Sequence, residues 1–264
     1  MTHIPSPVGE HLRLWRQRRR LSQLDLACNA EISTRHLSFI ETGRSLPSRE
    51  MLLRLAEQLD VPLRARNELM LAAGYAPHFA EHALADPAMG DALMAIERLL
   101  AAHEPFPALA VDRHWNMLHA NKTVALLLEG VAPGLLEFPV NVLRLSLHPE
   151  GLAPRILNLA EWRAHLLHRL LRQYEQTADP YLADLLAELR GYPVPCADAL
   201  PADANAIAVP LRLQTGEGVL SLLSATMIFG TPLDVTLSEL ALETFLPADG
   251  ATAALLRRLA PGHS

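Results

Sequence analysis

The sequence predicts two fold classes in one chain: an all-α domain of five helices at the N-terminus, and behind it an α+β domain with a roughly five-stranded antiparallel sheet. Three observations lead to this. Apolar residues recur at helical spacing from Val8 to Ala73. Short segments typical of strands begin at Pro107. The part from Ala206 to Leu246 consists of three further strand-like segments separated by glycine-containing turns.

Serines and glycines bound the helices of the N-terminal domain. Ser22 and Ser33 are predicted N-caps, because a serine hydroxyl accepts a bond from a free backbone N–H of the first turn. Gly43 and Gly74 end helices in the manner of C-terminal glycines, and Pro62 is placed in a first turn. The expected helices are Val8–Arg19, Ser22–Ala30, Ser33–Thr42, Ser48–Leu59 and Pro62–Ala73.

The second domain alternates helices with strands. Asn121 is expected to cap a short helix, Asp179-Pro180 to separate two long ones, and Pro210 to push its strand toward an edge or a bulge. The expected helices are Asp91–His103, Asn121–Leu128, Leu152–Arg190 in two pieces and Asp249–Leu259, and the expected strands are Pro107–Val111, Trp115–His119, Ala206–Leu213, Val219–Phe229 and Asp234–Leu246. We place the domains at 1–78 and 79–264, with 79–90 as a linker.

Composition restricts the protein class. The chain has 264 residues, half of them hydrophobic, which is enough for a buried core. It contains no apolar run of 18 residues and no signal-peptide pattern at its start, so we expect no membrane association. Its two cysteines, Cys28 and Cys196, lie too far apart in sequence to suggest a disulfide framework. We expect a cytoplasmic protein in which both cysteines are small buried packing residues.

Charge is distributed unevenly along the chain. Residues 1–78 hold eleven arginines and eight acidic residues, a net charge of +3, which leaves −9 for the rest of a chain of net charge −6. A basic head on an acidic body indicates two modules with different partners. A charge of +3 is modest and supports DNA binding only together with a motif.

That motif lies between Leu21 and Gly43, where two short helices joined by a tight break match a helix-turn-helix. At 100° per residue, Leu37 and Ile40 define the buried side of the second helix. Its outward face predicts base contacts, since arginine binds guanine with two hydrogen bonds and Thr or Phe contacts a thymine methyl. These candidate base contacts are Thr34, Arg35, Ser38 and Phe39.

Phosphate contacts are expected beside that face. Gln23 lies just inside the first helix of the motif, where its amide and the helix N-terminus suit a phosphate. Arg44 and Arg49 flank the loop after the second helix. Arg16 lies on the apolar side of the first predicted helix and needs a partner, for which Glu41 is the candidate. The run 18–20 of three arginines is equally consistent with a solvated face and with DNA contact.

The segments Ser22–Ala27 and Ile40–Ser48 resemble the phage-repressor-like helix-turn-helix family, also called the xenobiotic-response-element type. The resemblance implies five helices, the same base contacts, phosphate contacts from Gln23 and Arg44, and the internal pair Arg16–Glu41. Members of this family bind near-palindromic double-stranded DNA sites as dimers, so a homodimer is expected.

A second resemblance covers nearly the whole chain. The segments 35–50, 71–77, 105–116, 158–162 and 234–249 are similar to MmyB-like regulators. The similarity implies that residues from about 90 onward form a PAS-like ligand-binding domain, a five-stranded antiparallel sheet with helices on one face and a small apolar cavity. The five predicted strands are compatible with this fold, but by themselves they do not distinguish it from other folds.

The sequence does not identify the ligand. An apolar pocket suits a small hydrophobic or fatty-acid-like molecule. Large apolar residues are more often buried for packing than for ligand binding, so each candidate lining residue has a purely structural alternative role in the core. The alternative is a second domain that serves dimerisation or protein interaction alone. The candidate lining residues are Phe106, Trp115, Trp162, Tyr174, Met227 and Phe229.

The sequence contains few features of an enzyme or of a metal-binding protein. The sequence lacks a Gly-x-Gly-x-x-Gly, a P-loop and a Gly-x-Ser-x-Gly, so we expect no enzyme. No cysteine or carboxylate pair completes a tetrahedral set with the closely spaced histidines, so we expect no metal and no other cofactor. An axial haem ligand remains open. The histidines considered are His78 with His82 and His165 with His168 for metal, and His103, His114 and His119 for haem.

Overall fold

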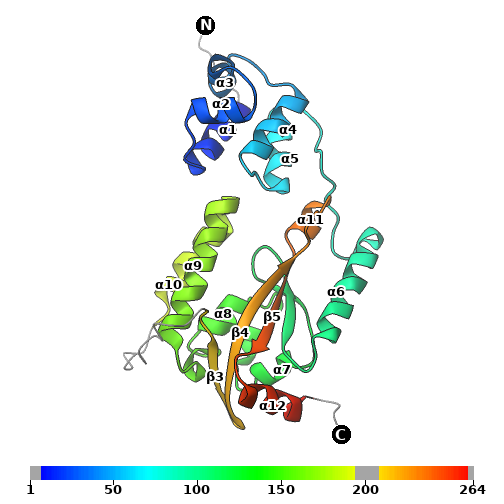
Figure 1. Ribbon diagram of the computed structural model, residues 1–264, viewed down its shortest axis with the longest axis vertical. Helices are drawn as coiled ribbons and strands as arrows, with labels where there is room; N and C mark the ends of the chain where they lie inside the picture. Colours follow the sequence, from blue (N-terminus) through cyan, green and yellow to red (C-terminus); the bar gives the residue numbers. More distant parts are fainter. Residues whose placement is uncertain (1–6, 194–207, 261–264) are drawn as a thin grey trace. The chain divides into compact units, whose positions relative to one another are not determined.

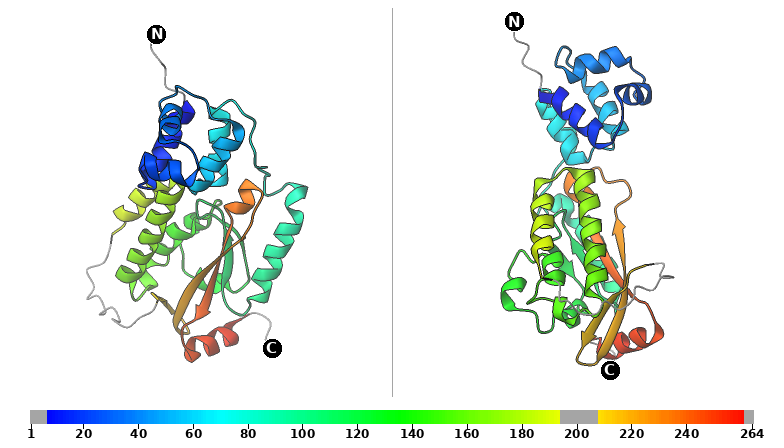
Figure 2. Two further views of the ribbon diagram at one scale, coloured as in Figure 1. Left: turned by 45° about the horizontal axis from the view of Figure 1, so that its top comes forward. Right: turned by 90° about the vertical axis from the view of Figure 1, so that its left-hand side faces the viewer.

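The computed structural model describes residues 7–193 and 208–260 and divides into two compact units. The first unit comprises the chain up to Glu81 with the short segments Glu175–Ala178 and Leu233–Val235, and the second comprises the rest. Each unit has a hydrophobic core of its own. Figures 1 and 2 show the helices of the first unit and the curled sheet and surrounding helices of the second.

Five helices form the first unit, and each end lies within one residue of its predicted position. Buried leucines from all five of them, together with Ile40, make a core with almost no solvent exposure. Helical periodicity was therefore sufficient to identify the elements and their buried faces. The helices are α1 Pro7–Arg18, α2 Gln23–Asn29, α3 Thr34–Glu41, α4 Arg49–Gln58 and α5 Leu63–Ala72.

Serine caps start three of these helices. The hydroxyls of Ser22, Ser33 and Ser48 each accept a hydrogen bond from the backbone N–H three residues later, at 3.1 to 3.2 Å. Ser22 also receives the reciprocal bond, because its own N–H donates to the carboxylate of Asp25 in a capping box. Pro62 occupies the N-cap position of α5 rather than the first turn, so the helix begins one residue later than predicted.

The second unit is built on a five-stranded antiparallel sheet in the order β2-β1-β5-β4-β3. The long strand β4 pairs with β3 at one end and with β5 along the rest of its length. The expected sheet of about five antiparallel strands is therefore confirmed. The strands are β1 Ala108–Val111, β2 Met117–Ala120, β3 Leu211–Thr215, β4 Gly218–Ile228 and β5 Ala241–Pro247.

Helices cover both faces of this sheet (Figure 1), so the expectation of helices on one face was wrong. Alternation along β1 divides its residues between two cores, with Leu109 and Val111 in the larger and Ala108 and Ala110 in the smaller. Ile96 of α6 closes the smaller core. Buried residues of α7, α8, α9, α10 and α12 belong to the larger core, and Leu237 of α11 packs against the smaller one. The helices that follow the first five are α6 Gly90–Ala102, α7 Val124–Leu127, α8 Val142–Leu147, α9 Leu159–Thr177, α10 Pro180–Gly191, α11 Val235–Ser238 and α12 Gly250–Leu259.

Several predicted elements of this unit are corrected. The single strand expected over Asp234–Leu246 is a helical turn, α11, followed by β5. α9 begins at Leu159 rather than Leu152, because a 3₁₀ turn, Ala153–Arg155, precedes it. Three short helices, 87–89, 133–136 and α8, were not predicted at all. Such elements are too short to show a hydrophobic period.

At the level of strand ends, β2 begins two residues later than expected because Trp115 has a left-handed backbone, with φ of 67°. The strand expected from Ala206 begins at Leu211, and its first two expected residues lie outside the described residues.

Asn121 and Cys28 do not have their expected roles. Thr123, not Asn121, precedes the first residue of α7. The buried amide of Asn121 instead accepts a bond from the N–H of Ala108 and donates to the carbonyl oxygens of Leu100 and Phe106. It thereby satisfies buried backbone groups of the α6–β1 connection. Cys28 is exposed on α2 rather than buried, and Cys196 lies outside the described residues.

Candidate DNA-binding surface and apolar cavity

The break between α2 and α3 has the backbone that a tight turn needs. Glu31 has a left-handed backbone, with φ of 56°, and its N–H donates to the carbonyl oxygen of Cys28. The N–H of Ile32 donates to the carbonyl oxygen of Ala27, so the turn is closed by two backbone hydrogen bonds. Ser33 then caps α3 as predicted. This geometry sets the angle at which α3 leaves α2.

The two sides of α3 are sorted as the helical geometry predicts. Leu37 and Ile40 are fully buried, and Arg35 is exposed on the other side. The guanidinium carbons of Arg35 and Arg44 lie 5.3 and 5.9 Å from the ring centre of Phe39. Two cations therefore gather around one aromatic ring. Such a contact is attractive and leaves the remaining guanidinium N–H groups available to a partner. Thr34 and Ser38 are partly exposed on the same helix.

The predicted pair Arg16–Glu41 is confirmed, and it is a bidentate ion pair. Arg16 Nε and Nη2 donate to the two carboxylate oxygens of Glu41 at 2.7 and 2.9 Å, and its Nη1 donates to the carbonyl oxygen of Leu21. Hydrogen bonding to Glu41 raises the pKa of Arg16. This buried pair joins α1 to α3. Removal of either partner would leave the other charge buried without compensation.

Gln23 extends this pair. Its side-chain amide donates to Glu41 Oε2 at 2.8 Å, a contact that the sequence argument did not anticipate. Gln23 therefore orients part of its amide inward while it sits in the first turn of α2. Among the predicted phosphate contacts, Arg44 and Arg49 are exposed, and Arg49 Nη2 lies 2.7 Å from Nδ1 of His78.

The larger core of the second unit is not completely filled. It contains a cavity of about 70 Å³ that opens to solvent. Its lining residues come from elements far apart in the sequence, from β1 near the start of the second unit to β5 near its end. Most of the lining is apolar. The lining residues are Leu109, Trp115, Met117, Val124, Leu127, Leu128, Val142, Leu143, Leu145, Ser146, Leu152, Trp162, Leu166, Arg169, Leu211, Ser224, Glu243 and Phe245.

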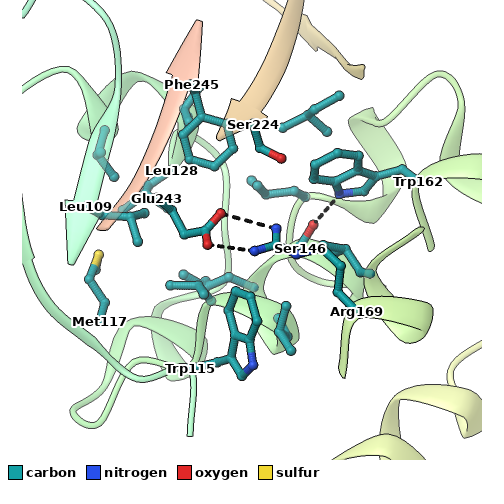
Figure 3. A pocket seen from close by; sticks show the side chains of 18 residues that line it. Leu109, Trp115, Met117, Leu128, Ser146, Trp162, Arg169, Ser224, Glu243 and Phe245 are labelled. Carbon is teal, nitrogen blue, oxygen red and sulfur yellow. Dashed lines mark hydrogen bonds and ion pairs between the residues drawn. The ribbon is translucent and has the colours of Figure 1, made fainter. Parts of the chain in front are cut away.

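An ion pair faces this apolar space (Figure 3). Arg169 of α9 donates from Nη2 to Glu243 Oε1 at 2.7 Å and from Nη1 to Oε2 at 3.2 Å. The hydroxyl of Thr226 joins the pair, because it accepts from Arg169 Nη2 and donates to Glu243 Oε1, both at 2.7 Å. Glu243 is 4% exposed. A carboxylate so deeply buried is stable only with such partners.

Both cavity tryptophans are held by hydrogen bonds of their indole N–H groups. Trp162 donates to the hydroxyl of Ser146 at 2.9 Å and Trp115 to the side-chain oxygen of Gln173 at 2.6 Å. The guanidinium of Arg169 lies 5.0 Å from the ring centre of Trp115. His165 stacks on Trp162, and burial lowers the pKa of this histidine, so that it stays neutral near pH 7.

Two of the six predicted lining residues, Trp115 and Trp162, line this cavity, and four lie elsewhere. Met227 is three residues after Ser224, and because successive side chains of a strand alternate, it lies on the opposite face of β4. Phe229 follows the end of β4 and packs on the smaller core. Phe106 and Tyr174 pack against the larger core without reaching the cavity.

The polar residues of the cavity were missed, although the sequence carried a signal for them. Trp162, Leu166 and Arg169 are spaced by four and three residues, the interval that places side chains on one face of a helix. Tyr174 falls off that stripe. Glu243 and Phe245 are two apart on one strand and share a face. An acidic residue inside an otherwise apolar strand is itself a reason to expect a buried partner.

The histidines considered for metal or haem are not among the lining residues of the cavity. None of His103, His114 and His119 is among the lining residues, and His114 Nε2 is 2.9 Å from a carboxylate oxygen of Asp179. In the described ranges, no group of three or more His, Cys, Asp and Glu side chains is arranged to hold a metal ion. Within the same residues, no helix is long and apolar enough to cross a membrane.

Comparisons with known proteins agree with both units. Residues 93–259 match the model of the MmyB-like transcription regulator ligand binding domain, and residues 7–69 match a helix-turn-helix domain. The first match alone spans more than half of the chain. A search of curated proteins gave no match. The two matches follow one another in the order of the two units that the structure defines. The chain therefore belongs to the MmyB-like transcription regulators.

Proposed function

We propose that this protein is a sequence-specific DNA-binding transcription regulator whose second domain responds to a small hydrophobic ligand. The observation that carries the first part is the face of α3 opposite its buried side, where Arg35 of the helix and Arg44 of the following loop lie near the ring of Phe39. The observation that carries the second is the apolar cavity in the larger core. A bound ligand would add contacts to residues of helices and strands that are far apart in the sequence.

On the DNA side, α3 enters the major groove and reads base edges. We assign base contacts to Arg35 and Phe39 with Thr34 and Ser38, and phosphate contacts to Arg44 and Arg49. Arg35 suits guanine and Phe39 suits a thymine methyl, because these are the groups that each side chain can recognise. We assign a phosphate contact to Gln23 as well, because its hydrogen bond to Glu41 holds its side-chain amide beside the N-terminus of α2.

Two copies of the chain are expected on one near-palindromic operator. Helix-turn-helix domains read half-sites about one turn of DNA apart, and a two-fold symmetric pair places one α3 in each. The N-terminal charge of +3 per copy is small for a single module. Doubling the number of phosphate contacts gives the affinity that one copy lacks.

On the ligand side, the lining favours a small hydrophobic or fatty-acid-like molecule. Aliphatic side chains dominate the walls, and burial of apolar ligand surface against them provides the affinity. The alternative is that the domain serves dimerisation or protein interaction without a ligand. A vacant apolar cavity would then be a permanent cost to the stability of this core.

Native mass spectrometry of freshly purified protein, followed by the same sample denatured, tests this proposal. We expect an extra mass that is lost on denaturation, and a native mass of two chains. If the native mass equals that of the bare chains, the sample is next titrated with hydrophobic metabolites. Failure of every compound to raise the melting temperature would favour the alternative of an assembly domain.

A further inference from the structure

We propose that the cavity selects apolar molecules with an uncharged hydrogen-bonding end, such as long-chain alcohols, amides or lactones, over the corresponding carboxylic acids. This inference rests on the proposed ligand function of the cavity and narrows its ligand class. The argument starts from the charges that face the cavity, because they decide which end group can be buried there.

The cavity already contains a balanced pair of charges. Arg169 and Glu243 are the only charged residues among the 18 described lining residues. They are joined by two hydrogen bonds of 2.7 and 3.2 Å, and the hydroxyl of Thr226 bonds to both. The positive charge of Arg169 is therefore matched inside the protein before any ligand arrives. This differs from a pocket in which a lone arginine waits for an anion.

A ligand carboxylate would be a third charge in this space. Its attraction to Arg169 would be offset by its repulsion from Glu243, since the two protein groups lie within hydrogen-bond distance of each other. The carboxylate would still lose its hydration on entering an apolar chamber. The balance of these effects disfavours an acid relative to a neutral molecule with the same hydrocarbon chain.

A neutral polar end has partners in the same place. Ser146 and Ser224 bring hydroxyls to the cavity wall, and the carboxylate and guanidinium have further acceptor and donor positions beyond those used in their pair. An alcohol or primary amide both donates and accepts, so it can bond to this group without disturbing its charge balance. Its desolvation cost is smaller than that of an ion.

The test compares matched ligands on the full chain. Dodecanol, dodecanamide and dodecanoic acid are titrated at pH 7, below the concentrations at which they aggregate, and their affinities are measured by isothermal calorimetry. We expect the alcohol and amide to bind at least about tenfold more tightly than the acid. Fluorescence of Trp115 and Trp162, both in the cavity wall, reports whether each compound occupies this site.

Variants of the pair test the cause. Glu243→Gln leaves Arg169 without its counter-charge, so the preference should invert and the acid should bind best. The double variant Arg169→Gln with Glu243→Gln removes both charges and should restore the preference for the neutral ligands. It also covers the case in which the single variant folds poorly. Glu188→Gln is the matched control, because Arg144 and Glu188 form a bidentate pair in the same domain that does not line the cavity.

The outcomes separate this inference from the proposed function. Preference of the unmodified protein for the acid would overturn the inference and leave the ligand function standing. An unchanged preference in Glu243→Gln would overturn it as well, since the charge pair would not be its cause. If no compound of either class binds to any variant, the ligand function itself is wrong and the inference falls with it.

Discussion

At the residue scale, Phe39 organises the exposed face of α3. Two guanidinium groups lie near its ring, from Arg35 at 5.3 Å and from Arg44 at 5.9 Å. The ring thus holds two flexible side chains close to where a DNA duplex would lie. Restricting such side chains before binding lowers the entropy lost on complex formation. Two arginines next to each other are nonetheless expected to act differently, one on a base and one on the backbone.

Arg35→Ala is expected to relax specificity at a single base pair and to cost about 1–3 kcal/mol of operator affinity. The reason is the loss of a two-hydrogen-bond contact to a guanine. Fluorescence anisotropy with an operator selected from random DNA, and with that operator altered at each position, measures the effect. If affinity falls equally on selected and random DNA, Arg35 does not read a base.

Arg44→Ala is expected to weaken binding to all sequences alike and to lower the slope of log affinity against log salt concentration by about 1. This follows from the release of one fewer counterion. Salt titrations from low to moderate ionic strength provide the slope. Arg258→Ala is the matched control, since it removes an exposed arginine of the other unit. An unchanged slope in Arg44→Ala would exclude a phosphate contact.

At the element scale, the first unit depends on the close approach of α1 to α3. Gly9 lies where a β-carbon would overlap the backbone oxygen of Ile40 and come within 2.9 Å of that of Glu41. Because the obstructing atoms belong to the backbone of α3, no side chain can move to make room. The ion pair Arg16–Glu41 fastens the same two helices a short distance away. This glycine in the first turn of α1 is required by packing and not by its backbone angles.

Gly9→Ala is therefore expected to destabilise the first unit by about 1–3 kcal/mol or more, because overpacking of a rigid contact outweighs the better helix propensity of alanine. Urea unfolding followed by circular dichroism measures the change. Gly250→Ala is the control, since that position in the first turn of α12 has no atom within 4 Å of the added carbon. Equal stability of the two variants would contradict the close packing of α1 on α3.

The α8–α10 contact contains a second network of polar groups. Arg144 holds Glu188 through two hydrogen bonds, and the hydroxyl of Tyr192 donates to the same carboxylate. Burial and this bond raise the pKa of Tyr192 to about 12. A raised pKa means that the folded state keeps the proton longer than the unfolded state. The associated stability is present below the unfolded value near 10 and is lost as the pH rises toward about 12.

Tyr192→Phe should remove this pH dependence. The variant is expected to be less stable than the unmodified protein at pH 8, by no more than about 1 kcal/mol because the group is partly exposed. The difference should shrink as the pH rises above 10, where the unmodified protein loses its advantage. Urea unfolding at a series of pH values measures it. A difference that stays constant to pH 11.5 would mean that Tyr192 has no raised pKa.

At the scale of the whole molecule, one chain combines a basic DNA-binding head with an acidic domain that contains a cavity. A regulator needs the occupancy of that cavity to alter the affinity for DNA. Coupling of this kind is reciprocal, so operator DNA must change ligand affinity by the same factor. The cavity can be filled by mutation without touching the surface of α3.

Leu128→Trp places a larger side chain at the partly buried cavity wall. We expect it to abolish the ligand mass in native mass spectrometry and any ligand-dependent change in operator affinity, with basal DNA binding retained. The added volume enters existing space, so stability should fall less than in Leu186→Phe, which overpacks the same core away from the cavity. A ligand that still binds to Leu128→Trp would place its site outside this cavity.

Much of the fold was legible in the sequence because the forces that set it act over a few residues. The serine caps at Ser22, Ser33 and Ser48 and the apolar periodicity fix the five N-terminal helices to within one residue. The buried faces of those helices follow from the same spacing, which is why Arg16 and Glu41 were paired correctly across 25 positions. The five strands of the sheet were also located, although several of their ends differ and the first half of the last expected strand contains the helical turn α11.

The cavity was decided by the tertiary structure. Glu243 and Arg169 are 74 positions apart, and nothing in either neighbourhood specifies which strand faces which helix. The order β2-β1-β5-β4-β3 brings the last strand to the centre of the sheet, and so places Glu243 opposite α9. Strand phase then directs Ser224 into the cavity and Met227 away from it. By itself, therefore, the sequence determined the five N-terminal helices with their buried faces and most of the longer elements that follow, whereas only long-range packing determined which side chains share the cavity.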